Sequence, residues 1–565
     1  MKSAQFKKDI IQFTLIIGVL LFINFFVSDI SLRWDLTEDQ RYSVAPETKE
    51  ALDKIKGDVR IEVFLEGDMP ASYSQLARGI KEKLQDLNVY SGGKLDVEFI
   101  DPFDGADSTK RLMQNFLKDR GIKPVVVQKK EQGKVMTKAL YPAVTITQNG
   151  ISIGVNLLKK GKITQSGKEL GELNREDIEQ TLNSLEFELV NGLKSTTVDG
   201  RQSIGFLAGH GELDYYELKD VEKRLQEYYN LFIYNLDSLN QKTLNKLDLL
   251  IIARPQAKFS DLDKYKIDQY LLQGGNIICF VDALKSQRTT EGDGLLAIPY
   301  ELNMRDLLFS WGVRINDEIV LDLESTGRPI EVEGSFKVIP STFTPRITNF
   351  NKSHKITKDL KALAVENFIG SLDTTTSAKG VKKTPLFFTS QYARVWQAPV
   401  TITGYDISHP VLKKEVYTHS NLPLAYLLEG DFKSFFKNKP IPKGGAKRKL
   451  DVAQIESKVL VVGDGGMIAN TLSADGKTYK PAGYATYDRI QYQNLIFLNN
   501  AIDYMLKKDF ITQKGVGFVA RPLDKIKIKD EKAYWQTINI VVPNVVIILF
   551  GVVFWVIRKK RFTKF

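Results

Sequence analysis

The chain has 565 residues, one cysteine and a formal net charge of +11. A single cysteine excludes an intrachain disulfide, and the length predicts several domains because one domain usually holds about 100–200 residues. Much of the positive charge lies at the ends, before a first long apolar stretch and after a last one. Since little net charge is left for the middle of the chain, we expect no nucleic acid as a partner.

Two apolar stretches, residues 10–27 and 540–557, each have about the 18 residues that a helix needs to cross a bilayer. Lysine and arginine flank both stretches on the side of the chain termini, so the positive-inside rule predicts two spans with both termini in the cytoplasm. A cleaved signal peptide is the alternative for the first stretch, but no small-residue cleavage pattern follows it. A lipoprotein anchor would need a cysteine near the N-terminus, which the sequence lacks.

After the first span, strand-like and helix-like patterns alternate, which predicts a small α/β domain. This order of elements resembles that of a thioredoxin-like domain, but no Cys-x-x-Cys pair is present and we expect no redox chemistry. A polar stretch then predicts a linker at 159–172, followed by a long helix at 174–193. The expected strands lie at 59–65, 94–100, 141–147 and 151–157, and the expected helices at 73–90 and 108–120.

A second α/β unit begins at residue 203, where near-continuous apolar strands alternate with helices. This pattern predicts a doubly wound, parallel sheet with helices on both faces. Ser260 is expected to cap one of these helices, with Asp263 three residues on and Gly274 ending it. Residues 283–455 mix short strands, turns and loops and are expected to form a long insertion. The expected strands are 203–207, 231–234, 247–253, 276–282 and 458–462, and a helix at 494–505 returns to the sheet.

Ligands of such sheets bind beyond the carboxyl ends of the strands. The candidate cleft there contains His210 and Glu212 after the first strand, Arg254 after the third and Asp282 after the fourth. These side chains could ligate a metal or act as acid and base. With four histidines in the chain and none at helical ligand spacing, we expect no metal and no catalytic residue. The turn at 463–466, Gly-Asp-Gly-Gly, lacks the spacing of a phosphate-binding loop, so we expect no cofactor.

Residues 33–44, RWDLTEDQRYSV, resemble the signature that follows the first span in auxiliary proteins of a bacterial ABC transport system linked to gliding motility, the GldG family. The resemblance implies a partner of an ABC permease (GldF-like) and of its cytoplasmic ATPase (GldA-like), with two copies of each subunit. It also implies that the second domain is a class I glutamine amidotransferase-like scaffold without the catalytic cysteine. Further segments agree in order along the chain: IGFLAGHGELD (204–214), LDLLIIARP (247–255), IDQYLLQGGNIICFVDA (267–283), LLEGDFKSFF (427–436) and ARPLDKI (520–526).

Together these features predict a protein of the inner membrane whose bulk lies in the periplasm. The expected organisation, in chain order, is a cytoplasmic tail (1–9), a transmembrane helix (10–30), an N-terminal periplasmic α/β domain (31–172), a second periplasmic α/β domain (173–535) with an insertion (283–455), a second transmembrane helix (536–557) and a basic cytoplasmic tail (558–565).

The expected function is that of a non-catalytic subunit that couples the permease to an envelope partner or substrate. A solute receptor is the first alternative, although two anchors argue against it. An envelope hydrolase that uses His210 and Glu212 is the second. Membrane lipids are expected as partners, and the expected contacts with the membrane interface or the permease are Arg33, Asp35, Arg41, Tyr42, Arg521, Asp524, Asn544 and Gly551.

Overall fold

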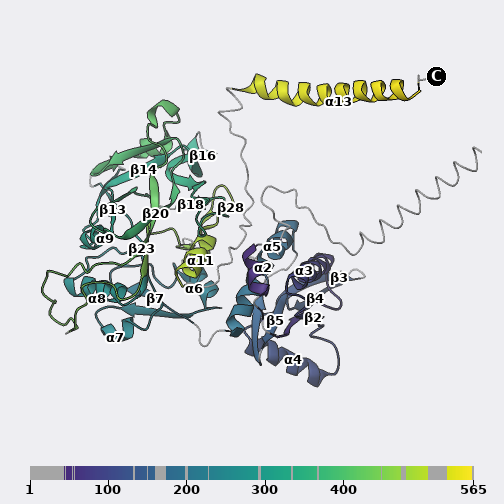
Figure 1. Ribbon diagram of the computed structural model, residues 1–565, viewed down its shortest axis with the longest axis horizontal. Coiled ribbons are helices and arrows are strands. Elements are labelled where there is room, and N and C mark those ends of the chain that lie inside the picture. The colour runs from purple at the N-terminus through teal and green to yellow at the C-terminus, as the bar shows by residue number, and fades with distance from the viewer. Residues whose placement is uncertain are drawn as a thin grey trace, which may run out of the picture. The chain divides into compact units, whose positions relative to one another are not determined.

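The computed structural model describes residues 44–562, apart from positions 45, 54, 56, 132–133, 149, 159–172, 198–201, 227, 290–293, 333–334, 366–367, 447, 473–478 and 507–530. The chain divides into two compact units, Met1–Gly517 and Phe518–Phe565. The first unit holds an N-terminal region (44–197) and a larger region (202–506), drawn in purple to blue and in teal to green in Figure 1. Several expectations lie outside the described residues: the first span, the linker, and Arg33, Asp35, Arg41, Tyr42, Arg521 and Asp524.

The N-terminal region is built on a four-stranded sheet with the order β2-β1-β5-β6. Strands β1 and β2 are parallel, and β5 and β6 are antiparallel to their neighbours. Alternate side chains of β1, from Val59 to Val63, are fully buried and share a core with the helices α3 and α5. The expected elements are found as β1 (Val59–Val63), α3 (Ala71–Tyr90), β2 (Leu95–Phe99), α4 (Asp107–Asp119), β5 (Ala143–Gln148), β6 (Ile151–Asn156) and α5 (Arg175–Thr197).

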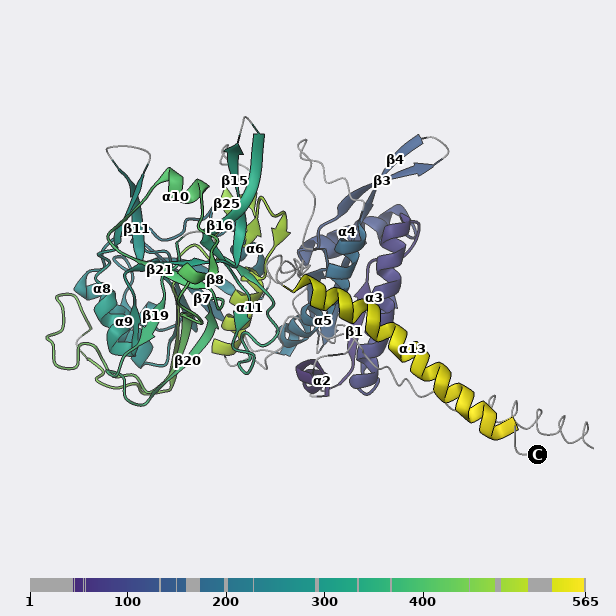
Figure 2. The same ribbon diagram turned by 90° about the horizontal axis from the view of Figure 1, so that it is seen from above.

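Three elements of this region were not predicted. Helix α2 (Pro46–Asp53) precedes β1 and contacts α3 and α5. Strands β3 (Val125–Glu131) and β4 (Lys134–Leu140) form a hairpin that projects from the region (Figure 2). Val127 and Leu140, at the base of the hairpin, belong to the core of this region. This buried segment is short, so it leaves only a weak hydrophobic pattern in the sequence.

The larger region contains an eight-stranded sheet with the order β17-β20-β23-β24-β10-β9-β7-β8. The five strands from β8 to β24 are parallel. Numbered by their order in the chain, they lie across the sheet as 2-1-3-4-5, the order of flavodoxin-like sheets. They are β7 (Ser203–Ala208), β8 (Asn230–Asn235), β9 (Leu249–Ala253), β10 (Asn276–Phe280) and β24 (Ser457–Val462).

Three strands of the expected insertion, residues 283–455, continue the same sheet. Strand β23 (Pro423–Gly430) pairs antiparallel with β24, followed by β20 (Val381–Phe388) and β17 (Asn349–Phe350). The sheet is therefore mixed. Every residue of β24 is buried, so its outer edge needs a hydrogen-bonding neighbour, and β23 supplies one.

Helices cover both faces of the large sheet. One core contains Ile277 and Cys279 of β10 together with residues of α7 (Gln241–Leu244), α8 (Asp261–Leu272) and α9 (Arg305–Trp311). The other core contains Ile278 and Phe280 together with residues of α6 (Lys219–Leu225) and α11 (Asn494–Met505). This two-sided burial explains why β9 and β10 are apolar at almost every position.

The predicted cap of α8 is confirmed. Ser260 Oγ accepts a hydrogen bond from the backbone N–H of Asp263, whose carboxylate accepts one from the N–H of Ser260. Gly274 follows the helix with a φ of 100°. Smaller elements complete the region: β11 (Leu284–Arg288), β12 (Leu295–Pro299), β13 (Val313–Ile315), β14 (Glu318–Asp322), β15 (Ser325–Val332), β16 (Ser335–Ile347), β18 (Leu363–Ala364), β19 (Leu372–Thr374), β21 (Ala393–Gln397), β22 (Val400–Ile402), α10 (Gly404–Ser408), η1 (Lys414–Val416), β25 (Thr471–Leu472), β26 (Tyr479–Lys480), β27 (Tyr484–Ala485) and β28 (Ile490–Gln491).

The described part of the second unit contains helix α13 (Lys532–Phe562). Within its segment Lys532–Ile557, the most apolar window of 18 residues has a mean hydropathy of 2.8, and in the described part of the chain α13 is the one helix long and apolar enough to cross a membrane. The predicted second span lies within it. Asn544 Nδ2 donates to the carbonyl of Ile540 one turn earlier, and Gly551 has no neighbour within 4 Å of an added Cβ.

Candidate functional site

The four residues of the candidate cleft lie at the same edge of the large sheet, beyond the carboxyl ends of the parallel strands. His210 follows β7, Arg254 follows β9 and Asp282 follows β10. Strands β8 and β9 lie on opposite sides of β7, so the switch point of the sheet is between β7 and β9. The structure divides these residues into two clusters, one around His210 and one around Arg254 and Asp282.

The histidine cluster consists of His210, Glu212, Phe259 and Asp263. The Nδ1 atom of His210 lies 3.1 Å from Glu212 Oε1, and its Nε2 atom lies 3.4 Å from Asp263 Oδ2. The ring stacks on Phe259 with 3.9 Å between centroids. Burial of the ring opposes its charge, but hydrogen bonds and charge attraction from Asp263 and Glu212 outweigh it and raise the pKa of His210 to about 9. His210 is therefore protonated at neutral pH and both ring nitrogens donate.

The backbone around His210 holds the cluster in place. Its N–H donates to Glu212 Oε2 at 2.6 Å, and its carbonyl accepts from the N–H groups of Gln256 and Ala257, both at 2.7 Å. Gly209 and Gly211 on either side have φ values of 112° and 74°, a conformation that favours glycine. The loop after β7 is thus tied to the segment after β9.

Asp263 and Phe259 belong to the cluster but were not among the candidate residues. Asp263 both caps α8 and faces the imidazole. Burial raises its pKa, but hydrogen bonds from His210 and Ser260 outweigh burial and lower the pKa overall. The capping signal Ser260-x-x-Asp263 could have pointed to it, because it places a carboxylate at a helix N-terminus near the strand ends.

The arginine cluster consists of Arg254, Glu217, Asp282 and Gly465. Arg254 has a φ of 54°, and its Nη2 forms an ion pair with Glu217 Oε1. Asp282 Oδ1 accepts a hydrogen bond of 2.6 Å from the N–H of Gly465. Burial raises the pKa of Asp282 to about 6, despite the opposing effects of that N–H and of the Arg254 charge. Arg254 Nε is buried with no hydrogen-bond partner among the described residues.

The turn after β24 fills the space beside this cluster. A Cβ on Gly465 would lie 2.8 Å from both Arg254 Cγ and Asp282 Oδ2, so this position needs glycine for close approach. Asp464 is buried, and its Oδ1 accepts from the N–H of Gly466. The N–H groups of Gly465 and Gly466 therefore donate to carboxylates of the protein.

At this edge of the sheet, the charged candidate side chains pair with other side chains of the protein. In the described residues, no group of three or more His, Cys, Asp or Glu side chains is placed to hold a metal ion. Cys279 lies in the middle of β10 with no exposed area, and burial raises the pKa of its thiol. A protonated histidine and a buried thiol are poor nucleophiles and poor bases.

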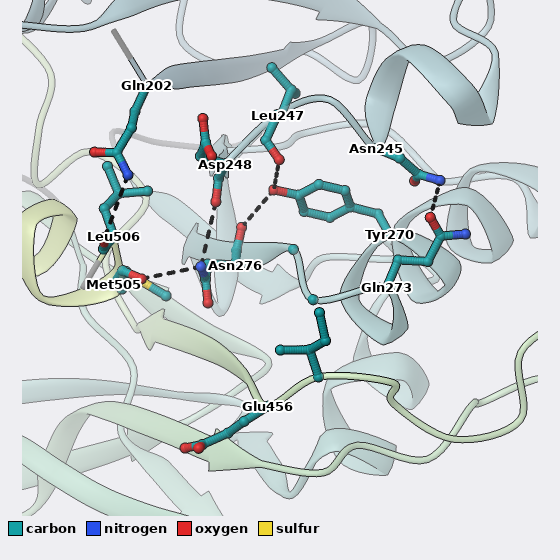
Figure 3. Close-up of a pocket in the computed structure, with 13 residues that line it drawn as sticks. Gln202, Asn245, Leu247, Asp248, Tyr270, Gln273, Asn276, Glu456, Met505 and Leu506 are labelled. Carbon is teal, nitrogen blue, oxygen red and sulfur yellow. Dashed lines mark hydrogen bonds between the residues drawn. The ribbon is translucent and has the colours of Figure 1, made fainter. Parts of the chain in front are cut away.

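A pocket of about 270 Å³ lies at the opposite, amino ends of the strands (Figure 3). Tyr270 reaches into it and its hydroxyl donates to the carbonyls of Leu247 and Asn276, both at 3.3 Å. Asn276 Nδ2 donates to the carbonyl of Met505. Since the lining comes from segments far apart in the chain, no local pattern could have predicted it. The other lining residues are Gln202, Asn245, Asp248, Gln273, Gly274, Gly275, Ile455, Glu456 and Leu506.

Comparison with known proteins relates most of the chain to two sequence families. Residues 201–501 match a family described as an ABC-type uncharacterized transport system, and residues 38–147 match a domain of unknown function, DUF7088. An uncharacterized protein of Borreliella burgdorferi is 20% identical over 574 residues, which covers 98% of this chain and 99% of that protein.

Three solved structures resemble part of the chain at low identity. The N-terminal domain of mmIFT52 is 15% identical with a TM-score of 0.33, and the match covers 55% of this chain and 100% of that domain. A ThuA-like protein from Bacteroides uniformis is 13% identical with a TM-score of 0.27, covering 54% of this chain and 91% of that one. The exo-β-1,4-mannosidase Op5Man5 from an Opitutaceae bacterium is 10% identical with a TM-score of 0.19, covering 53% of this chain and 37% of the enzyme.

Proposed function

Because the chain belongs to the family of ABC-type uncharacterized transport systems, which residues 201–501 match, we propose that it is a non-catalytic auxiliary subunit of an ABC transporter. Its partners are a permease and a cytoplasmic ATPase, similar to GldF and GldA, and its relatives in function are the GldG proteins of gliding motility. The subunit couples the state of the permease to an envelope partner or to the transported substrate.

The observation that carries the non-catalytic role is the pairing of His210. In an α/β enzyme, the carboxyl ends of the strands hold the reacting groups. Here the raised pKa of His210 favours its protonated form between Glu212 and Asp263, and Arg254 is paired with Glu217. These contacts leave neither a free base nor an exposed nucleophile among the candidate residues. We further propose that the larger region is a class I glutamine amidotransferase-like scaffold and that the N-terminal region, with its β2-β1-β5-β6 sheet, is a thioredoxin-like domain, both used for binding.

The anchor at the C-terminal end supports attachment to a membrane complex. Helix α13 contains 26 residues, Lys532–Ile557, with a hydropathy suited to a bilayer. With a first span at 10–30, both termini lie in the cytoplasm and the bulk in the periplasm. A membrane-impermeant thiol reagent should then label Lys443→Cys, an exposed loop residue, in cells with a permeabilised outer membrane. It should not label Thr563→Cys in the basic tail. Labelling of Thr563→Cys without labelling of Lys443→Cys would contradict the proposed topology.

The direct test is purification of the full-length protein in a mild detergent, followed by identification of the proteins that accompany it. We expect a permease with many spans and an ATPase, in fixed ratio to this subunit. Recovery of the subunit without either protein, from membranes that contain both, would overturn the proposal.

One observation favours a second function, that of a solute receptor. The pocket at the amino ends of the strands is lined by polar groups, including Asp248 and Glu456, and is large enough for a small solute. A receptor would be stabilised by its ligand. A rise in the thermal midpoint with one member of a panel of small polar solutes, abolished by Glu456→Leu, would establish this alternative.

A further inference from the structure

Strand β8 ends the eight-stranded sheet, and β7 is its one neighbour in the sheet among the described strands (Figure 2). The N–H of Asn230 donates to the carbonyl of Gln202, at the start of β7, over 3.0 Å. Backbone groups alternate in direction along a strand. The backbone N–H and C=O groups of Leu231, Ile233 and Asn235 therefore point to the open side of the sheet.

The strand is also apolar and exposed at this edge. Phe232 is 40% exposed and Ile233 59% exposed, on opposite faces of the sheet. Phe232 stacks on Tyr234 with 5.7 Å between ring centroids. Soluble proteins usually protect an edge strand with a charge, a proline or a bulge. Strand β8, with the sequence NLFIYN, has no charge or proline, and its register with β7 is unbroken over all six residues.

We propose that β8 pairs antiparallel with β8 of a second copy of this chain, which joins the two large sheets into one. A two-fold axis perpendicular to the sheet keeps each face continuous, so residues that pair must lie on the same face. An axis through Ile233 meets this condition. It places Ile233 opposite Ile233 of the second copy, Leu231 opposite Asn235, and Phe232 opposite Tyr234.

This register suits both the backbone and the side chains. Leu231, Ile233 and Asn235 are the residues whose backbone groups are open, and they form the hydrogen-bonded pairs. The carbonyl of Asn235 already accepts from Ser238 Oγ at 3.1 Å, and a carbonyl oxygen can accept a second bond. Phe232 and Tyr234 form the non-hydrogen-bonded pairs, where side chains of antiparallel strands come closest. Each aromatic pair occurs twice, and no like charges face each other.

Cross-linking tests the register directly. Cys279 is fully buried, so Ile233→Cys adds the one accessible thiol in the described residues. Residues in a hydrogen-bonded pair have Cα atoms about 5.5 Å apart, within the range of a disulfide. We expect mild oxidation of the full-length variant, purified alone in detergent, to convert most of it into a covalent dimer that dithiothreitol dissociates.

Ser238→Cys is the matched control, because Ser238 is exposed like Ile233 and lies only five residues from it in the chain. It lies in the turn after β8, beyond the residues that pair, so its two copies would not face each other. Equal cross-linking of both variants, or none of Ile233→Cys, would overturn the proposal.

A charge exchange separates self-pairing from binding of another protein. Ile233→Lys and Ile233→Glu each place like charges opposite one another, so each alone should be a monomer by light scattering, at half the mass of the wild-type protein. A mixture of the two should form a heterodimer. Dimers of either single variant, a monomeric wild-type protein, or a mixture that stays monomeric would contradict the two-fold interface. The last result, with Ile233→Lys also losing a co-purified protein, would assign the edge to an extended segment of that protein. Since the purified subunit is used, these results do not depend on binding to the permease.

Discussion

The Nδ1 atom of His210 lies 3.1 Å from Oε1 of Glu212, the residue two positions later in the chain. The sequence suggests an acid–base pair at this place. In the structure, the carboxylate instead stabilises the imidazolium, together with Asp263 on the opposite ring nitrogen. A histidine held in its charged form cannot accept a proton near neutral pH, so the pair stabilises the loop after β7 and does not act as a base.

Replacement of His210 should weaken the fold. His210→Ala leaves Glu212 and Asp263, whose side chains are 2% and 4% exposed, without their shared partner. Breaking a buried charge pair in this way costs about 3–5 kcal/mol. We expect a fall of several degrees in the thermal midpoint of the full-length protein. His409→Ala, at an exposed histidine, is the control and should change the midpoint little. An equal midpoint for both variants would show that the cluster is not stabilising.

The same cluster predicts a loss of stability in mildly alkaline solution. The pKa of His210 is raised from 6.5 to about 9 in the folded protein. Its stabilisation, roughly 3 kcal/mol, is therefore fully present below pH 6.5 and is lost as the pH rises through 9. Asp282, with a pKa near 6, has completed its titration below most of this window.

The measurement is the thermal midpoint between pH 6.5 and about 9.5. We expect the midpoint of the wild-type protein to fall and that of His210→Gln to fall less, so that the two curves converge. Parallel curves would mean that another group is responsible for the pH dependence.

Gly465 should not tolerate a side chain. A methyl group there would lie 2.8 Å from Arg254 Cγ and Asp282 Oδ2, so the turn after β24 would have to move. Overpacking of this kind costs about 1–3 kcal/mol. Gly404→Ala is a matched control, because its added Cβ has no neighbour within 4 Å. Chemical denaturation of both variants, monitored by tryptophan fluorescence, should show a clear loss of unfolding free energy for Gly465→Ala alone.

Helix α13 should bind the permease through its small and polar residues. Asn544 and Gly551 are seven residues apart, and such residues allow transmembrane helices to approach closely. Asn544→Leu with Gly551→Leu should reduce the permease that co-purifies with the full-length protein. Val546→Leu with Val553→Leu has the same spacing on the same helix and should leave the yield unchanged. If the first variant retains the full yield, α13 is a tether and not a contact surface.

Local signals were sufficient for many elements of this protein. The apolar run of β9, the Ser260–Asp263 cap of α8 and the helical spacing of α3 each depend on residues within a few positions of one another, and the structure contains all three. The carboxyl ends of parallel strands meet at one edge, so the placement of His210, Arg254 and Asp282 at that edge could also be predicted. The partners Asp263 of His210 and Glu217 of Arg254 could not be predicted from such local signals, because they come from other segments of the chain.

Tertiary structure alone decided which distant segments meet. Asp263 reaches His210 from 53 residues away, and Glu217 reaches Arg254 from another loop. Strand β23, from the expected insertion at residues 283–455, joins β24, which the pattern of that segment does not indicate. The physical reason is that the open edge of an apolar strand can be satisfied by any strand of matching length and polarity, because backbone hydrogen bonds carry no sequence code. The choice among such partners, and the burial that sets the charge of His210, follow from how the whole core packs.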